Sequence, residues 1–208
     1  MKYKWLNKKQ NSKLIIFFNG WGMDENIVEH LDYENFDILM FYDYNTLDHD
    51  FQFDIIKEYA DKYLISWSMG VMIASTFASM LNPIKKSVAI NGTLKPIDID
   101  FGIHPKIYDL TIKGFNEQSC KKFIDSMFSN KNDAINIKNS RNFENLHTEL
   151  VAIKSFKSNE DFKYNKVLIS NDDKIIPTKS QVKFWQIEPN VNTGHCPFFL
   201  YKKWSELL

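Results

Sequence analysis

Residues Leu64–Val71 read LISWSMGV, and this stretch decides the fold of the chain. An apolar run ends at Trp67, and a helical pattern begins at Met69. Between them, SWSMG (66–70) has the small-x-Ser-x-Gly form of a sharp strand-to-helix turn whose central serine is a nucleophile. Such a turn needs small flanking residues because backbone passes close to backbone. The first position holds serine where glycine is usual, so the pentapeptide alone leaves open whether Ser68 is a nucleophile or an ordinary buried serine.

Strands and helices alternate on both sides of this turn. Short apolar runs predict buried strands, and segments with helical apolar spacing follow most of them. This alternation predicts an α/β fold, with a mostly parallel sheet and helices on both faces. The predicted strands cover 14–18, 36–42, 63–67, 86–92 and 166–170, and the predicted helices cover 24–31, 53–61, 69–80, 116–128, 143–157, 178–186 and 197–208.

The alternation stops over residues 101–161, where no strand is convincing. Two helical segments there flank a polar, Asn-rich stretch. We interpret this block as an inserted helical cap on a core formed by 1–100 and 162–208, within a single domain. Two ordinary crossover helices joined by a long loop are the alternative.

Composition narrows the class of protein. The 208 residues include 26 basic and 26 acidic side chains, so a net charge of zero gives no electrostatic reason to expect nucleic acid or an anionic membrane as partner. Cys120 and Cys196 are isolated and do not suggest a metal site. The charged N-terminal segment precedes only five apolar residues, too few for a secretion signal or a membrane span. We therefore expect a cytoplasmic monomer with free thiols and no metal or other cofactor.

A serine hydroxyl needs a base, and the base needs an orienting acid. Hydrolases with this turn carry them in the order Ser, Asp or Glu, then His. His195 follows Gly194 near the C-terminus, where such a base belongs, and none of the other four histidines follows a late strand. Asp173 begins an Asp-x-apolar-apolar-Pro pattern (173–177) after the strand predicted over 166–170; Asp172, one residue out of register, is the alternative. A helix-capping histidine and a polar loop are the competing structural interpretations.

The reaction also requires donors for an oxyanion. In this fold they are the backbone N–H after the nucleophile and one from the loop after an early strand. Met69 supplies the first, and the loop NGWG (19–22) supplies the second, with the N–H of Trp21 as our choice. Gly20 allows backbone to approach the substrate. The alternative is a tight turn with a packed tryptophan.

Four segments together resemble the pimeloyl-acyl-carrier-protein methyl ester esterases of biotin synthesis, in particular a shorter branch with an FxGWGMD opening. They are FFNGWGMD (17–24), SWSMGV (66–71), SNDDKIIP (170–177) and TGHCPF (193–198). The resemblance implies an α/β-hydrolase that cleaves the methyl ester of pimeloyl-acyl carrier protein, releasing methanol. It implies Ser68 as nucleophile, His195 as base and Asp173 as orienting acid, with Trp21 and Met69 at the oxyanion hole. Asn19 and Ser66 depart from the commonest hydrolase pattern without removing a catalytic group.

The implied partner, an acyl carrier protein bearing methyl pimelate, is acidic, so the resemblance implies a basic docking surface. The candidates are Arg141, which is the only arginine, and Lys138, Lys121 and Lys122. Acidic residues lie among them, so a solvated face of mixed charge is the alternative. A general short-acyl carboxylesterase or thioesterase, and a non-catalytic ligand-binding protein on the same scaffold, are the competing functional hypotheses.

Overall fold

Six strands form one sheet in the order β1-β3-β2-β4-β5-β6. The computed structural model describes residues 1–129 and 141–208. Strands β2 to β6 run parallel, and β1 pairs antiparallel to β3 at the edge. The prediction of an α/β fold with a mostly parallel sheet is confirmed. The strands are β1 (Lys2–Asn7), β2 (Lys13–Phe18), β3 (Phe36–Tyr42), β4 (Asp61–Trp67), β5 (Lys86–Ile90) and β6 (Lys166–Leu168).

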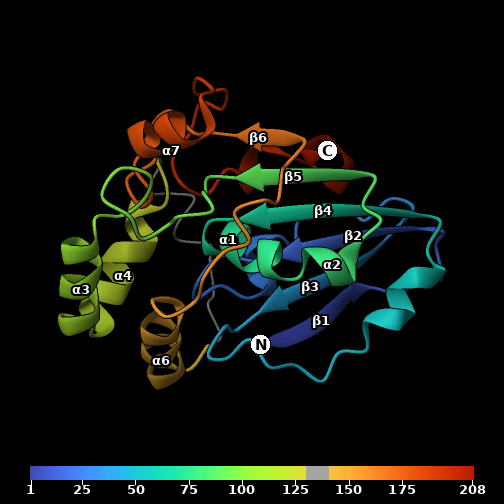
Figure 1. Cartoon of the computed structure of the whole chain (residues 1–208), viewed down its shortest axis with the longest axis horizontal. Helices are drawn as coiled ribbons and strands as arrows, with labels where there is room; N and C mark the ends of the chain where they lie inside the picture. The colour runs from blue at the N-terminus through green and yellow to red at the C-terminus, as the bar shows by residue number, and fades with distance from the viewer. Residues whose placement is uncertain (130–140) are drawn as a thin grey trace.

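From β2 onward, each connection between consecutive strands contains a helix or a 3-10 segment (Figure 1). The α-helices are α1 (Met69–Thr76), α2 (Ala78–Leu81), α3 (Pro105–Lys113), α4 (Glu117–Ser126), α6 (Phe143–Ile153) and α7 (Thr178–Trp185). Single 3-10 segments are η1 (Glu25–Ile27), η2 (Phe53–Glu58), η3 (Phe198–Leu200) and η4 (Trp204–Leu207).

The central strand β2 shows why the sheet is buried on both faces. Successive side chains of a strand point to opposite faces, and a strand covered on both sides is apolar throughout. Leu14, Ile16 and Phe18 pack in one core cluster with helix α1, whereas Ile15 and Phe17 pack in another with the C-terminal turns. In Figure 1, α1 and α2 lie in front of the sheet and the C-terminal segment lies behind it. The chain after β6 therefore closes the second face.

Three predicted helices are wrong, and one strand is present that the sequence did not predict. The predicted strands begin at residue 14, whereas the structure has an additional edge strand, β1, in which lysines alternate with Tyr3 and Trp5. The helix predicted over 197–208 is instead two 3-10 turns, because Tyr201 is extended and interrupts it. The segments 24–31 and 53–61 likewise form only the short 3-10 segments η1 and η2.

Among the described residues of the block 101–161, α3 is a helix that the sequence did not predict. Helices α3, α4 and α6 lie together beyond the ends to which the strand arrows of β2, β4 and β5 point (Figure 1). The interpretation of the block as an inserted cap stays a prediction. Its placement matters because binding sites of open α/β sheets form at the carboxyl edge of the strands.

Asp37 is a buried carboxylate near the amino end of β3, away from the carboxyl ends of the strands. Its Oδ1 accepts hydrogen bonds from the Lys9 and Asn11 N–H groups at 2.9 and 3.3 Å, and its Oδ2 accepts one from the Tyr59 hydroxyl at 2.7 Å. Burial acts to raise the pKa of Asp37, but these hydrogen bonds outweigh it and hold the pKa below its ordinary value. The ionised carboxylate therefore stabilises this end of the fold.

Candidate active site

Ser68 occupies the sharp turn between β4 and α1. Its backbone has φ 56° and ψ −126°, a strained conformation for a residue with a side chain. The Ser68 N–H donates to the carbonyl of Ile90 at 2.9 Å, which ties the turn to the end of β5. A Cβ at Gly70 would lie 2.4 Å from the carbonyl oxygen of Phe18, so only glycine lets α1 begin this close to the end of β2. The sequence pattern and its tight packing requirement therefore agree.

His195 lies directly beside Ser68. The Ser68 hydroxyl is positioned to donate to His195 Nε2, with 2.8 Å between the two atoms, and the His195 side chain is 1% exposed. The carbonyl of His195 accepts hydrogen bonds from Trp67 Nε1 and Asn91 Nδ2, each at 2.9 Å. These two buried donors fix the backbone of His195, and neither is part of the motifs that single out the histidine.

Asp173 completes the chain of hydrogen bonds. His195 Nδ1 lies 2.8 Å from Asp173 Oδ2, and the Nε2 amide of Gln181 on α7 donates to the same oxygen at 2.8 Å. The other oxygen, Oδ1, accepts from the backbone N–H groups of Ile175 and Ile176 at 2.9 and 3.1 Å. Three of the four contacts are N–H donors, so the carboxylate is held in place on the side away from His195 as well. Gln181 carries no sequence signal that would have identified it.

The alternative, Asp172, lies elsewhere. Its carboxylate is 51% exposed, pairs with Lys174 at 3.2 Å and accepts from the Ser129 hydroxyl at 3.4 Å. The structure thus brings Ser68, His195 and Asp173 together and leaves Asp172 at the surface.

The loop after β2 reaches the same point. A Cβ on Gly20 would lie 3.3 Å from the Cβ of Ser68 and 2.8 Å from the Trp67 ring, so glycine is needed for this approach. Asn19 holds the loop, since its Oδ1 accepts from the Gly20 N–H at 2.8 Å and its Nδ2 donates to the carbonyl of Asp24 at 2.9 Å. Within the described parts of the chain, the backbone N–H groups of Trp21 and Met69 donate no hydrogen bond to a protein acceptor. Both donors remain available to a substrate oxygen.

A small cavity of about 140 Å³ opens above Ser68. Trp21, Met69 and Lys174 line it, together with apolar side chains from the block 101–161: Ile103, Ile107, Tyr108, Phe123 and Leu150. A groove of about 480 Å³ between α3 and α4 shares Trp21, Ile107, Thr111 and Phe123 with this cavity. Small-molecule sites typically have this apolar character with a few convergent polar groups.

The predicted docking residues fall into three groups. Lys121 and Lys122 are exposed on α4, and Lys122 lines the groove between α3 and α4. Arg141 is unsuited to docking, because its side chain is 5% exposed and pairs with Asp43 at 3.1 Å and Glu149 at 2.8 Å. A lone arginine on a cap suggested a surface contact, and its burial between two carboxylates corrects that expectation. Lys138 lies outside the described residues.

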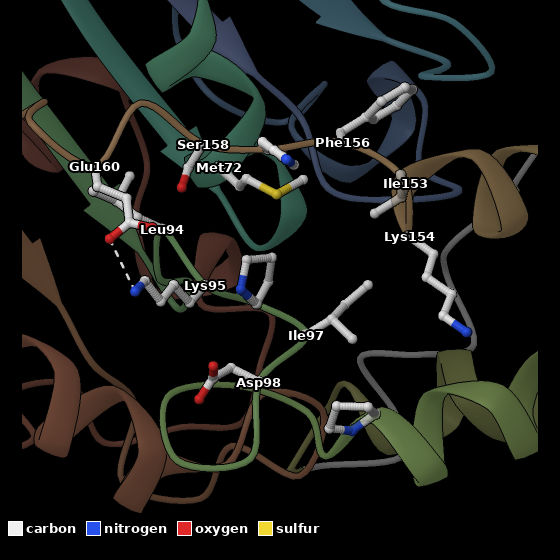
Figure 2. Close-up of a pocket in the computed structure, with 13 residues that line it drawn as sticks. Met72, Leu94, Lys95, Ile97, Asp98, Ile153, Lys154, Phe156, Ser158 and Glu160 are labelled. Atoms are coloured by element: carbon white, nitrogen blue, oxygen red, sulfur yellow. Dashed lines mark ion pairs between the residues drawn. The ribbon is translucent and has the colours of Figure 1, made fainter.

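A second cavity of about 510 Å³ is lined by Met72 of α1, by the segment after β5 and by the end of α6 (Figure 2). Its rim is charged, with Lys95 and Glu160 paired at 2.9 Å. Among the described residues that line it, none belongs to the predicted site. The cavity above Ser68 is therefore the one that the site residues define.

Residues 1–129 and 141–208 contain neither a cluster of metal ligands nor a helix that could cross a membrane. No group of three or more His, Cys, Asp or Glu side chains there could hold a metal ion. No helix in these ranges has both the length and the apolar character needed to cross a membrane.

Comparisons with known proteins relate this chain to one family and one fold. The family described as pimeloyl-ACP methyl esterase BioG matches residues 1–207. The structure is similar to that of BioG from Haemophilus influenzae, with a TM-score of 0.89 and 30% identity, over 100% of this chain and 99% of that one. It shares the fold of an esterase from Exiguobacterium antarcticum, with a TM-score of 0.66 and 15% identity, over 93% of this chain and 87% of that one.

One curated relative is a longer protein. A Bacteroides fragilis protein named malonyl-[acyl-carrier protein] O-methyltransferase is 38% identical over 179 residues, which are 83% of this chain and 36% of that protein. The chain thus spans about a third of the length of this relative. Since the family match covers nearly every residue, the chain belongs to the BioG family of pimeloyl-ACP methyl esterases, a family of carboxylic ester hydrolases.

Proposed function

We propose that this chain hydrolyses the methyl ester of pimeloyl-acyl carrier protein with a Ser68-His195-Asp173 triad and an acyl-enzyme. The observation that carries the proposal is the continuous chain of contacts from Ser68 Oγ to His195 and on to Asp173, each 2.8 Å long. This arrangement has the geometry of an activated nucleophile with an oriented base.

The proposed reaction has two acyl-transfer steps. Ser68 Oγ attacks the ester carbonyl carbon while His195 Nε2 takes the hydroxyl proton. The backbone N–H groups of Met69 and Trp21 stabilise the oxyanion. His195 then gives its proton to the departing methoxide, which leaves as methanol. Water, deprotonated by the same histidine, cleaves the acyl-enzyme to leave a free carboxylate and regenerate Ser68.

The family and the pocket support the choice of substrate. The apolar lining of the 140 Å³ cavity suits the methylene chain of an acyl group. One carboxyl end of this substrate is linked to the carrier and the other is a methyl ester, so neither end carries a charge that the cavity would have to pair. The Bacteroides relative is named for O-methylation of a carrier-bound acyl group, which connects this family with carrier-bound methyl esters. We propose that the carrier approaches over α4, where the groove meets the exposed Lys121 and Lys122.

The proposal is tested with purified protein and two substrates, methyl pimeloyl-acyl carrier protein and free dimethyl pimelate. We expect a kcat/KM that is higher by at least about tenfold for the carrier-linked ester. Ser68→Ala should abolish hydrolysis of both while the thermal unfolding temperature stays near that of wild type. Equal turnover of both esters would favour a general carboxylesterase or thioesterase. Full activity of Ser68→Ala would refute the triad assignment. A wild-type protein that neither cleaves esters nor reacts with a fluorophosphonate would indicate a non-catalytic binding protein.

A further inference from the structure

Helix α6 is joined to the oxyanion loop by a buried carboxylate that plays no part in the triad. Glu149, on α6, has a side chain with 0% exposure. Its Oε1 accepts a hydrogen bond from the Tyr44 N–H at 2.7 Å, and its Oε2 accepts one from the Gly22 N–H at 3.3 Å. Glu149 therefore bonds two backbone segments that follow β3 and β2.

The charge of this carboxylate is compensated by the only arginine in the sequence. Arg141 Nη1 lies 2.8 Å from Glu149 Oε2, and Arg141 Nη2 lies 3.1 Å from Asp43 Oδ1. Lys2 pairs with the other oxygen of Asp43 at 2.7 Å, so two cations face two carboxylates. Removing one member of a buried pair leaves an uncompensated charge, which is far more costly than the pair itself is stabilising.

The same helix makes a second contact with the loop. Trp21 Nε1 donates to the carbonyl of Leu146, one turn before Glu149 on α6, at 3.1 Å. Gly22 has a φ of +73°, so the chain turns sharply directly after Trp21. The N–H of Trp21 thus lies between an indole fixed by Leu146 and a following peptide fixed by Glu149.

We propose that Glu149, held by Arg141, is a positioning residue that aims the Trp21 N–H at the oxyanion. The inference rests on the proposed function, since it concerns the oxyanion hole of the same reaction. Glu149 touches neither substrate nor triad and acts through Gly22. The structural reason for a carboxylate here is that it presents an acceptor oxygen on two sides, Oε1 toward the Tyr44 N–H and Oε2 toward the Gly22 N–H and Arg141.

The electrostatics of the pair agree with this geometry. Burial raises the pKa of the Glu149 carboxyl, while the charge of Arg141 and the hydrogen bonds from Tyr44 and Gly22 oppose that rise. A buried pair of this kind contributes little net stability, so its value lies in fixing one arrangement of the groups it joins.

Glu149→Gln tests the proposal because it keeps the shape and removes one acceptor. The amide has a single oxygen, so either Tyr44 or Gly22 faces NH₂, and in both cases the joint between α6 and the loops after β2 and β3 loses one of its two hydrogen bonds. We expect kcat for a p-nitrophenyl ester to fall about tenfold to a hundredfold with KM within about twofold of wild type. A trifluoromethyl ketone, whose adduct with Ser68 carries an oxyanion, should bind more weakly by the same factor as kcat/KM. Glu144→Gln, the same change on the exposed face of α6, should leave all three values unchanged.

A second variant separates positioning from stability. Arg141→Gln combined with Glu149→Gln removes both charges, so it should unfold at a higher temperature than Glu149→Gln alone and still show the reduced kcat. Recovery of kcat together with stability would overturn the proposal, as would wild-type kcat in folded Glu149→Gln.

The experiment also distinguishes failure of the inference from failure of the proposed function. The ester is carrier-free, so an incorrect acyl substrate leaves the result unaffected. An active wild type with an equally active Glu149→Gln refutes the positioning pair alone. An active Ser68→Ala refutes the triad and the pair together.

Discussion

Asp173→Asn is the sharpest perturbation that the structure offers. The carboxylate accepts four hydrogen bonds, two at each oxygen, and an asparagine has one oxygen. If that oxygen stays on the N–H groups of Ile175 and Ile176, the NH₂ group faces His195 Nδ1 and the Gln181 amide. Gln181 can turn its oxygen toward the new NH₂, but it then gives up its bond to the carbonyl of Ile176, now 2.7 Å long.

The expected magnitude follows from the histidine. An NH₂ group at 2.8 Å requires His195 Nδ1 to accept, so the proton moves to Nε2, the nitrogen that faces Ser68 Oγ. A histidine in that tautomer cannot take the serine proton. We expect kcat to fall about 10⁴-fold, the loss typical of the wrong tautomer, which corresponds to about 5.5 kcal/mol of activation free energy. KM should change little because Asp173 does not contact the substrate cavity.

The assay is hydrolysis of a short p-nitrophenyl ester at neutral pH, with Asp172→Asn as the matched control. Asp172 undergoes the same chemical change one residue away, at an exposed carboxylate, and should retain wild-type kcat. Activity of Asp173→Asn within about tenfold of wild type would refute the reasoning, because a tautomer defect costs far more. An equal loss in Asp172→Asn would refute the choice between the two carboxylates.

Two further predictions concern the surface and the sheet. Reversing Lys121 and Lys122 to glutamate should lower kcat/KM for the carrier-linked ester about tenfold and leave kcat/KM for the free ester unchanged. The control Lys154→Glu, at the rim of the second cavity, should leave kcat/KM unchanged for both esters. Equal losses on both esters would contradict docking at Lys121 and Lys122. Asp37 has a folded-state pKa below the ordinary value of an aspartate, so its contribution to stability is present at higher pH and is lost as the pH falls through the folded pKa. Urea unfolding at about pH 7 and about pH 3 should therefore show a smaller acid-induced loss for Asp37→Asn than for wild type, and equal losses would contradict this assignment.

Much of the site was predictable because its residues lie in short local patterns. Ser68 and Asp173 follow strands β4 and β6, His195 follows the isolated bridge between Ser170 and Val191, and the order of these segments along the chain is the one that the hydrolase fold requires. Parallel strands place their carboxyl ends at one edge, so a strand-by-strand interpretation already brings the segments together. The residues that hold them, such as Gln181 and Asn91, could not be predicted, because they act through contacts between segments far apart in sequence.

Arg141 shows most clearly where the sequence stops being informative. A lone arginine in a polar stretch suggested a docking contact, and the distances to Asp43 and Glu149 give it a buried role instead. Nothing local distinguishes these outcomes, since both carboxylates are ordinary in their own segments.

By itself, the sequence determined the α/β class, the strained turn at Ser68 and the triad candidates, because strand periodicity and steric limits on backbone act over a few residues. Only the tertiary structure decided that Asp173 rather than Asp172 faces His195, and that the arginine lies inside the protein. Those outcomes depend on which oxygen and nitrogen atoms meet when β2, β6 and α6 pack together. Such contacts, between residues 22 apart for Asp173 and His195 and in different segments of the chain for Arg141 and Asp43, are set by the packing of the whole fold and leave no periodic trace along the chain.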